Sequence, residues 1–161
     1  MRRQYKRQQG KSTIKKKKKT ELKFDGIEFK SGLEVYCYKE LKKAGLAFEY
    51  EGKTFSLTKD DKLPFDVYKR TQKTPIHKVK SKISRGTKYT PDFLVYDGKD
   101  IVFVIETKGY ANESFPIRVK LWYSYCINSI KTLKAYFLPS NQKEVDFTIS
   151  KILEYPFKKR P

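Results

Sequence analysis

Cysteine and histidine are scarce in this chain of 161 residues, which contains two Cys and one His. Cys37 and Cys126 lie far apart, each inside an apolar pattern, and no spacing of Cys and His typical of zinc ligands occurs. We therefore interpret both cysteines as reduced core residues of a cytosolic protein.

Long apolar runs are also absent. No run of about 18 apolar residues occurs, so we expect no transmembrane helix. The first residues are charged and no hydrophobic segment follows them, so we expect no secretory signal. Residues 2–19 lack the apolar face of an amphipathic membrane anchor. These absences favour a protein without a membrane partner, placed in the cytoplasm, or in the host-cell cytoplasm if a phage encodes it.

Acidic residues are few relative to basic ones, since 18 Asp and Glu accompany 37 Lys and Arg, for a formal net charge of +19. Residues 1–23 hold 11 of the basic residues, one acidic residue and almost nothing apolar, so we expect this tail to be disordered in isolation. Residues 24–161 still carry +9. A polyanionic partner, first of all nucleic acid, is the natural inference. A solubilising charge excess and a protein that only binds RNA are the alternatives.

The apolar content is sufficient for one hydrophobic core, since 38% of the chain is apolar and 15% is aromatic. Asp25-Gly26 predicts a hairpin turn within residues 22–29. Ser31 and Glu34 fit a capping box that begins a helix, and Gly45 ends it. Other strands are expected at residues 46–50, 55–57, 89–96, 101–108 and 133–138, and a C-terminal helix at 142–155.

A second helix is expected to begin near Pro116 and to be largely buried. Its apolar residues are Val119, Trp122, Tyr123, Cys126 and Ile130 on one side, with Ile117 and Leu121 beside them. Residues 58–88 are charged and poorly patterned, and we interpret them as a long basic excursion or an irregular hairpin. The order of elements predicts an α/β fold with a mixed β-sheet flanked by helices.

Two short motifs carry chemistry: Tyr89-Thr90-Pro91-Asp92, and Ile105-Glu106-Thr107-Lys108-Gly109 at the end of the next strand. Alternation along a strand places Glu106 and Lys108 on one face and Thr107 on the other, with the Thr107 carbonyl near the position of a metal ion. Carboxylate oxygens suit Mg²⁺, which clamps phosphoryl oxygens and acidifies water. Lys108 would position the water or neutralise developing charge.

Each of these residues also has a purely structural interpretation. Asp92 can cap a turn after Pro91, and Glu106 with Lys108 can form an ion pair at a strand end. Glu34 is explained equally well by the capping box. His77 is interpreted as solvated or facing DNA. Three aromatic residues could stack on bases, but core packing is the better interpretation for Trp122, Tyr123 and Tyr125.

With Pro91-Asp92 and Glu106-Thr107-Lys108, the sequence resembles the PD-(D/E)XK nuclease superfamily. Within that superfamily it looks like the endonuclease I family of phage Holliday-junction resolvases, from about Phe29 to Leu138. The segments that carry this resemblance are Phe29-Lys30-Ser31-Gly32-Leu33-Glu34, Phe48-Glu49-Tyr50-Glu51, Tyr89-Thr90-Pro91-Asp92-Phe93-Leu94 and Glu106-Thr107-Lys108-Gly109. The stretch from Lys53 to Lys88 is longer than the resemblance implies.

The resemblance implies a restriction-endonuclease-like fold over residues 24–161 and a phage enzyme of DNA recombination that cuts branched DNA as an intertwined homodimer. It implies Mg²⁺, with Mn²⁺ as a substitute, and no small-molecule cofactor. By matching motifs, the catalytic residues fall on Glu34, Asp92, Glu106 and Lys108. The metal ligands would be Asp92, Glu106, Glu34 and the Thr107 carbonyl.

Basic residues outside these motifs are the candidates for DNA binding. Arg118 and Lys120 lie near the turn that follows the active strand, where phosphate contact is favoured over simple solvation. The full set is Lys15, Lys16, Lys17, Lys18, Lys19, Arg85, Lys88, Arg118 and Lys120.

The leading hypothesis is a Mg²⁺-dependent endonuclease that hydrolyses phosphodiester bonds in branched DNA. Two alternatives stay open. One is a nicking or DNA-degrading nuclease without junction preference, and the other is a non-catalytic nucleic-acid-binding protein whose acids are structural.

Deletion of residues 1–23 tests the tail. Because an electrostatic arm contacts phosphates without reading bases, the truncated protein should bind all DNA sequences more weakly and with a shallower salt dependence. Its cooperative unfolding should persist. Loss of that cooperative transition would show that the tail is part of the fold.

Overall fold

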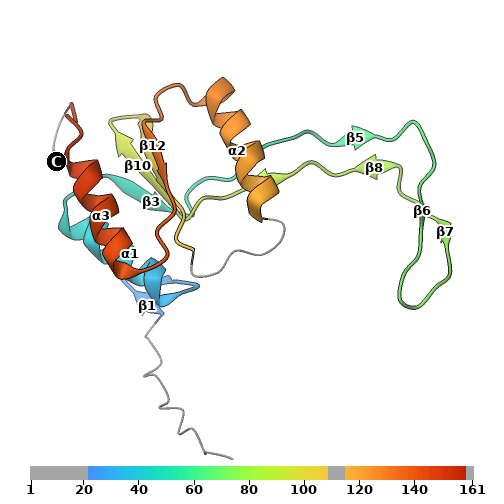
Figure 1. Cartoon of the computed structure of the whole chain (residues 1–161), viewed down its shortest axis with the longest axis horizontal. Helices are drawn as coiled ribbons and strands as arrows, with labels where there is room; N and C mark the ends of the chain where they lie inside the picture. The colour runs from blue at the N-terminus through green and yellow to red at the C-terminus, as the bar shows by residue number, and fades with distance from the viewer. Residues whose placement is uncertain (1–21, 109–114, 159–161) are drawn as a thin grey trace, which may run out of the picture.

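The structure, a computed structural model, describes residues 22–108 and 115–158 (Figure 1). The predicted tail therefore lies outside the described residues, except for its last two. Lys23 already belongs to a strand, β1 (Lys23–Phe24), which pairs with β2 (Ile27–Glu28). Asp25 and Gly26 between them have φ angles of 57° and 79°, as a tight hairpin turn requires. The predicted hairpin is confirmed.

Helix α1 (Gly32–Lys43) begins where the sequence predicts. The Ser31 hydroxyl accepts a hydrogen bond from the Glu34 amide at 3.2 Å, which satisfies one of the amides at the helix start. The capping box is incomplete, because the Glu34 carboxylate accepts from the Lys30 amide rather than from Ser31. Gly45, with φ of 66°, follows the last turn.

The central sheet has four strands in the order β12-β11-β10-β3. Strands β3 (Phe48–Tyr50) and β11 (Asp100–Ile105) each pair antiparallel with β10 (Phe93–Asp97). Strand β12 (Ala135–Phe137) runs parallel to β11. The predicted mixed sheet is therefore confirmed.

Helices cover the two faces of this sheet (Figure 1). Helix α1 and helix α3 (Gln142–Leu153) pack on one face, over a core that includes Leu41, Phe93 and Ile149. Helix α2 (Phe115–Ser129) packs on the other face, where Trp122 is fully buried. The buried strands alternate between the two cores, so the sheet is a doubly covered layer, as its apolar sequence predicts. None of the described helices is long and apolar enough to cross a bilayer.

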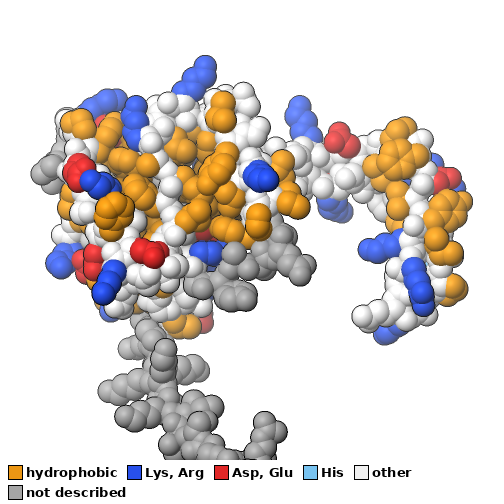
Figure 2. Space-filling view, viewed as in Figure 1, with side chains coloured by type: hydrophobic (Ala, Val, Ile, Leu, Met, Phe, Trp, Pro, Cys, Tyr) orange, Lys and Arg blue, Asp and Glu red, His pale blue; other side chains and the backbone are white. Residues whose placement is uncertain are grey.

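Helix α2 is less buried than predicted. Phe115, Val119, Trp122 and Cys126 are buried, but the other sides of the helix are exposed and carry Ile117, Tyr123 and Ile127. The prediction of a largely buried helix was wrong because apolar residues lie on more than one side of α2, whereas the sheet covers only one. Figure 2 shows apolar side chains on the surface of this part of the molecule.

Residues 57–87 form a long two-stranded projection, here called the arm (Figure 1). It starts between β4 (Phe55–Ser56) and β9 (Lys88–Tyr89), which pair with each other at the core. Farther out, β5 (Asp61–Lys62) pairs with β8 (Ile83–Ser84), and β6 (Tyr68–Lys69) pairs with β7 (His77–Lys78). The predicted irregular hairpin is confirmed.

One predicted strand, residues 89–96, is divided in the structure. Strand β9 ends at Tyr89 and pairs with β4, whereas β10 starts at Phe93 and belongs to the central sheet. Pro91 lies between them and has no amide hydrogen to donate to a ladder, so the chain changes sheets there. Asp92 stands just before the central strand.

Candidate active site

The β10–β11 hairpin brings the two acidic motifs together. Phe93 pairs with Ile105, so Asp92 and Glu106 lie side by side just beyond the paired ends of the two strands. Asp92 Oδ2 accepts hydrogen bonds from the Thr107 amide at 2.8 Å and from the Thr107 hydroxyl at 2.7 Å. The Thr107 side chain therefore contacts Asp92 directly, a contact that the sequence did not predict.

Glu106 is buried, and both of its carboxylate oxygens have donors. The Tyr89 hydroxyl donates to Oε2 at 2.8 Å, and the Lys108 ammonium donates to Oε1 at 2.9 Å. The hydroxyls of Tyr89 and Tyr136 lie 2.8 Å apart, which extends the network away from the acids. Glu106 and Lys108 thus share a side, as predicted.

Lys108 is held from two directions. Its ammonium pairs with Glu106 and also lies 4.5 Å from the centre of the Phe115 ring, at the start of α2. The side chain is 30% exposed, compared with 5% for Glu106. Lys108 is therefore the more exposed member of this ion pair.

Glu34 reaches the site from α1, on the side of β3. Its Oε2 accepts hydrogen bonds from the Tyr50 hydroxyl at 2.6 Å and from the Lys30 amide at 2.9 Å. No hydrogen bond in the described structure links Glu34 to Asp92 or Glu106. Its effect on Asp92 is electrostatic, through its negative charge.

The electrostatics of the site centre on Asp92. Burial raises the pKa of Asp92 to about 7, the charge of Glu106 adds to this effect, and the two Thr107 hydrogen bonds oppose it. The charge of Glu34 raises this pKa further. Burial also raises the pKa of the Tyr89 phenol, so this hydroxyl stays protonated and donates to Glu106.

The donor set fits a hard divalent cation, because the acidic side chains supply oxygen ligands and their mutual repulsion would be relieved by added positive charge. In the described parts of the chain, no three acidic, cysteine or histidine side chains lie close enough together to hold one ion. The pair Asp92 and Glu106 is therefore the unit that the fold assembles, and Glu34 is not brought into it.

The predicted DNA-binding residues that the structure describes lie in two places. Arg85 and Lys88 are exposed where the arm returns to the core. Lys120 is exposed on α2, and Arg118, within one helical turn of it, is half-buried. Lys15 to Lys19 lie outside the described residues. His77 is exposed in the outer part of the arm, and its Nδ1 lies 3.0 Å from the Pro75 carbonyl.

Two of the aromatic residues on α2 act mainly as core. Trp122 is fully buried, and Tyr125 stacks on it with ring centres 5.8 Å apart. The network also contains tyrosines whose roles the motifs did not reveal, namely Tyr50, Tyr89 and Tyr136. Tyr89 begins the motif Tyr89-Thr90-Pro91-Asp92 and Tyr50 lies in the segment Phe48-Glu49-Tyr50-Glu51, but neither pattern predicted these contacts.

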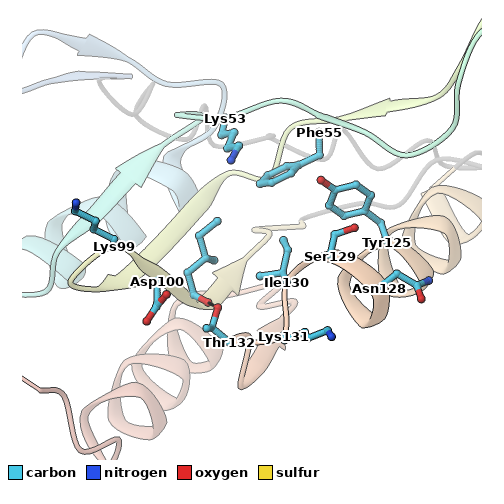
Figure 3. Close-up of a pocket in the computed structure, with 11 residues that line it drawn as sticks. Lys53, Phe55, Lys99, Asp100, Tyr125, Asn128, Ser129, Ile130, Lys131 and Thr132 are labelled. Atoms are coloured by element: carbon cyan, nitrogen blue, oxygen red, sulfur yellow. Dashed lines mark hydrogen bonds between the residues drawn. The ribbon is translucent and has the colours of Figure 1, made fainter.

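A hollow of about 450 Å³ lies at the other end of the hairpin (Figure 3). Lys53, Phe55, Tyr125 and Lys131 are among the residues around it, and Asp100 is the single acidic side chain in its lining. Asp100 opens β11, whereas Glu106 follows the last residue of that strand. The hollow is therefore separate from the acidic pair.

Comparison with known families places the chain in one of them. The family model described as "Protein of unknown function (DUF1064)" matches residues 13–137, which include the arm and all four candidate catalytic residues. The chain therefore belongs to the DUF1064 family. No curated protein and no solved structure matches it.

The raised pKa of Asp92 makes stability depend on pH. The carboxyl ionises near pH 3.8 in the unfolded chain but near pH 7 in the folded protein, so the folded state binds more protons between these values. The native protein therefore loses stability from this group as pH rises from about 4 to about 7. Asp92→Asn removes this titrating group. The free energy of unfolding of the variant, measured relative to wild type, should therefore rise by about 2 to 4 kcal/mol between about pH 4 and about pH 7 and stay constant above that range.

Urea unfolding at several pH values between 4 and 8.5 measures this difference. Asp100→Asn is the matched control, because this half-exposed carboxylate at the other end of the hairpin pairs with Lys158 at the surface. A difference between Asp92→Asn and wild type that does not change with pH would contradict the assigned pKa.

Proposed function

We propose that this member of the DUF1064 family is a metal-dependent endonuclease of the restriction-endonuclease-like type, which hydrolyses phosphodiester bonds in DNA and acts on branched DNA. One observation carries the proposal. Asp92, Glu106 and Lys108 meet beyond the end of a buried β-hairpin, and Asp92 and Glu106 are too close to remain charged together without cost.

The residues divide the chemistry among them. Asp92 and Glu106 would hold the Mg²⁺, which when bound supplies positive charge at the phosphate oxygens and makes water more acidic. Lys108, the more exposed partner of Glu106, is assigned to the negative charge that develops on the phosphate. Tyr89 orients Glu106 by its hydrogen bond and is a positioning residue.

Glu34 is less directly connected to the site than Asp92, Glu106 and Lys108. It lies on α1 near the acidic pair and influences Asp92 by charge, but its hydrogen bonds go to Tyr50 and Lys30. A role as metal ligand would require the carboxylate to turn from these partners. We therefore assign Glu34 primarily to raising the pKa of Asp92 through its negative charge.

The exposed basic residues near the hairpin support DNA as the substrate. Lys120 on α2 and Arg85 and Lys88 at the root of the arm are exposed. A net charge of +19 over the chain attracts a polyanion and increases its rate of encounter.

Cleavage assays on a four-way junction, a linear duplex and a single strand, with and without Mg²⁺, test the proposal. Asp92→Asn and Glu106→Gln should each lower the cleavage rate at least about 100-fold, because each removes a charge needed to hold the cation. DNA affinity should be unchanged or higher, since a negative charge near the phosphate is lost. Tyr89→Phe should cost about tenfold.

Two controls make this test sharper. Asp100→Asn removes a carboxylate from the other end of the same hairpin and should cut like wild type. MgCl₂ should raise the melting temperature of the wild type but not of Asp92→Asn, because a cation that binds only the folded site stabilises it. Undiminished cutting by both Asp92→Asn and Glu106→Gln would refute the proposed site. A wild type that binds DNA but cuts none of the three substrates in Mg²⁺ would leave a non-catalytic binding protein as the better account.

Junction preference predicts a dimer. Paired cuts on strands related by a two-fold axis need two sets of catalytic residues, and one chain supplies one set. The apolar residues between Phe29 and Tyr50, a plausible source of an interface on sequence grounds, largely pack into the chain's own core, as Cys37 and Leu41 do. Light scattering at low micromolar concentration should give a dimer. A strict monomer, alone and on junction DNA, would favour a nicking enzyme.

A further inference from the structure

The arm, residues 57–87, projects away from the core, on which only Leu57 at its root packs among the apolar residues of the arm (Figure 1). Its two strands are joined by backbone hydrogen bonds, among them Leu63 to the Lys82 carbonyl at 2.7 Å and Val79 to the Val67 carbonyl at 2.8 Å. Each strand has about 15 residues and reaches at most about 50 Å. This length compares with about 34 Å for one turn of duplex DNA.

The positive charge of the folded part is concentrated in the arm. The arm contains nine Lys or Arg residues and three Asp, a net charge of +6, whereas all of residues 24–161 carry +9. The rest of residues 24–161, although several times longer than the arm, therefore carries only +3. The arm is the natural contact for a polyanion.

Two of the three acids in the arm are already engaged. Asp66 pairs with Lys78 at 2.7 Å and with Lys82 at 3.1 Å, and Asp60 accepts a hydrogen bond from the Gly86 amide at 2.7 Å. Seven basic residues of the arm have no ion pair with any described residue: Lys59, Lys62, Lys69, Arg70, Lys73, Lys80 and Arg85. These side chains are available to phosphates.

The arm has no core of its own. Leu63, Val67 and Val79 are half-buried, while Phe65, Tyr68, Ile76 and Ile83 are between 56% and 70% exposed. Figure 2 shows apolar and basic side chains side by side on the outer part of the arm. An isolated two-stranded ribbon is marginally stable in water, so a partner that covers these exposed apolar side chains would stabilise the arm.

The arm is nevertheless shaped by specific residues. A Cβ atom on Gly86 would lie 2.2 Å from the Thr58 carbonyl oxygen, so only glycine lets the two strands approach so closely near the root. At the outer turn, the Thr71 hydroxyl accepts a hydrogen bond from the Thr74 amide at 3.1 Å. These contacts define a ribbon rather than a loose loop.

We propose that the arm lies in a groove of duplex DNA as a two-stranded ribbon. The major groove admits such a ribbon, with basic side chains on the phosphates and apolar side chains against base edges and sugars. This inference rests on the proposed function, because it names the way in which the nuclease holds its substrate. A second copy of the chain is disfavoured as partner, because the arm at +6 would approach a surface that is itself positive.

Binding to a duplex of 30 base pairs in metal-free buffer with EDTA tests the arm without requiring cleavage. In one variant of the full chain, Asn-Gly replaces residues 57–87. Ser56 and Lys88 are partners in the β4–β9 ladder, so this two-residue turn closes the hairpin with that pairing kept. A second variant, Lys69→Gln with Arg70→Gln and Lys80→Gln, removes three charges and leaves the arm in place.

Both variants should bind the duplex at least about tenfold more weakly at physiological salt. The slope of log affinity against log salt should become shallower by up to about 3 in the triple variant, since each phosphate contact contributes about 0.9. The matched control is Lys131→Gln with Lys134→Gln and Lys143→Gln, which removes three exposed charges from the surface of the domain outside the arm. This control should change affinity and slope much less.

The result that overturns the proposal is an unchanged affinity and slope in the triple variant. If, in addition, light scattering shows that loss of the arm converts a dimer to a monomer, the arm holds a second copy and not DNA. The proposed nuclease activity is tested separately by the cleavage assays. Weak binding by the arm variants together with no cleavage by wild type would support the groove contact and refute the nuclease activity.

Discussion

The register of the β10–β11 hairpin is the constraint on which the candidate site depends. Phe93 opposite Ile105 places Asp92 and Glu106 next to each other, and a shift of one residue would move one of them to the other face of the sheet. Buried side chains on both faces fix that register, because Phe93 and Leu94 enter opposite cores. The two packed faces therefore specify the position of both carboxylates.

Burial of these carboxylates is costly, and the surrounding hydrogen bonds show how the fold offsets the cost. Glu106 receives donors at both oxygens and keeps a cation beside it, whereas Asp92 has only Thr107 and shows the raised pKa. A fold selected for stability alone would be better served by apolar residues at these positions. The imbalance at Asp92 is the feature that favours the proposed metal site over a purely structural ion pair.

Local signals in the sequence predicted much of this arrangement. Asp25-Gly26 and Ser31 define their turn and helix cap through interactions within a few residues, so the sequence alone was sufficient. The side shared by Glu106 and Lys108 follows from strand alternation. The contacts of Tyr89 with Glu106 and of Tyr50 with Glu34 join residues far apart in the chain, and only the packed structure shows them. For α2, an apolar pattern on several sides could not show which side the sheet would cover.

The arm and the candidate site are joined through one residue. Tyr89 ends β9, the strand that carries the chain back from the arm, and its hydroxyl donates to Glu106. Its ring packs against Trp122 with centres 5.0 Å apart, and its neighbour across the ladder, Phe55, packs against the same indole at 5.0 Å. The root of the arm is thus fixed to α2 and to the acidic pair at once. A displacement of β9 would alter the hydrogen bond that orients Glu106, so the position of the arm and the geometry of the carboxylate cannot be independent.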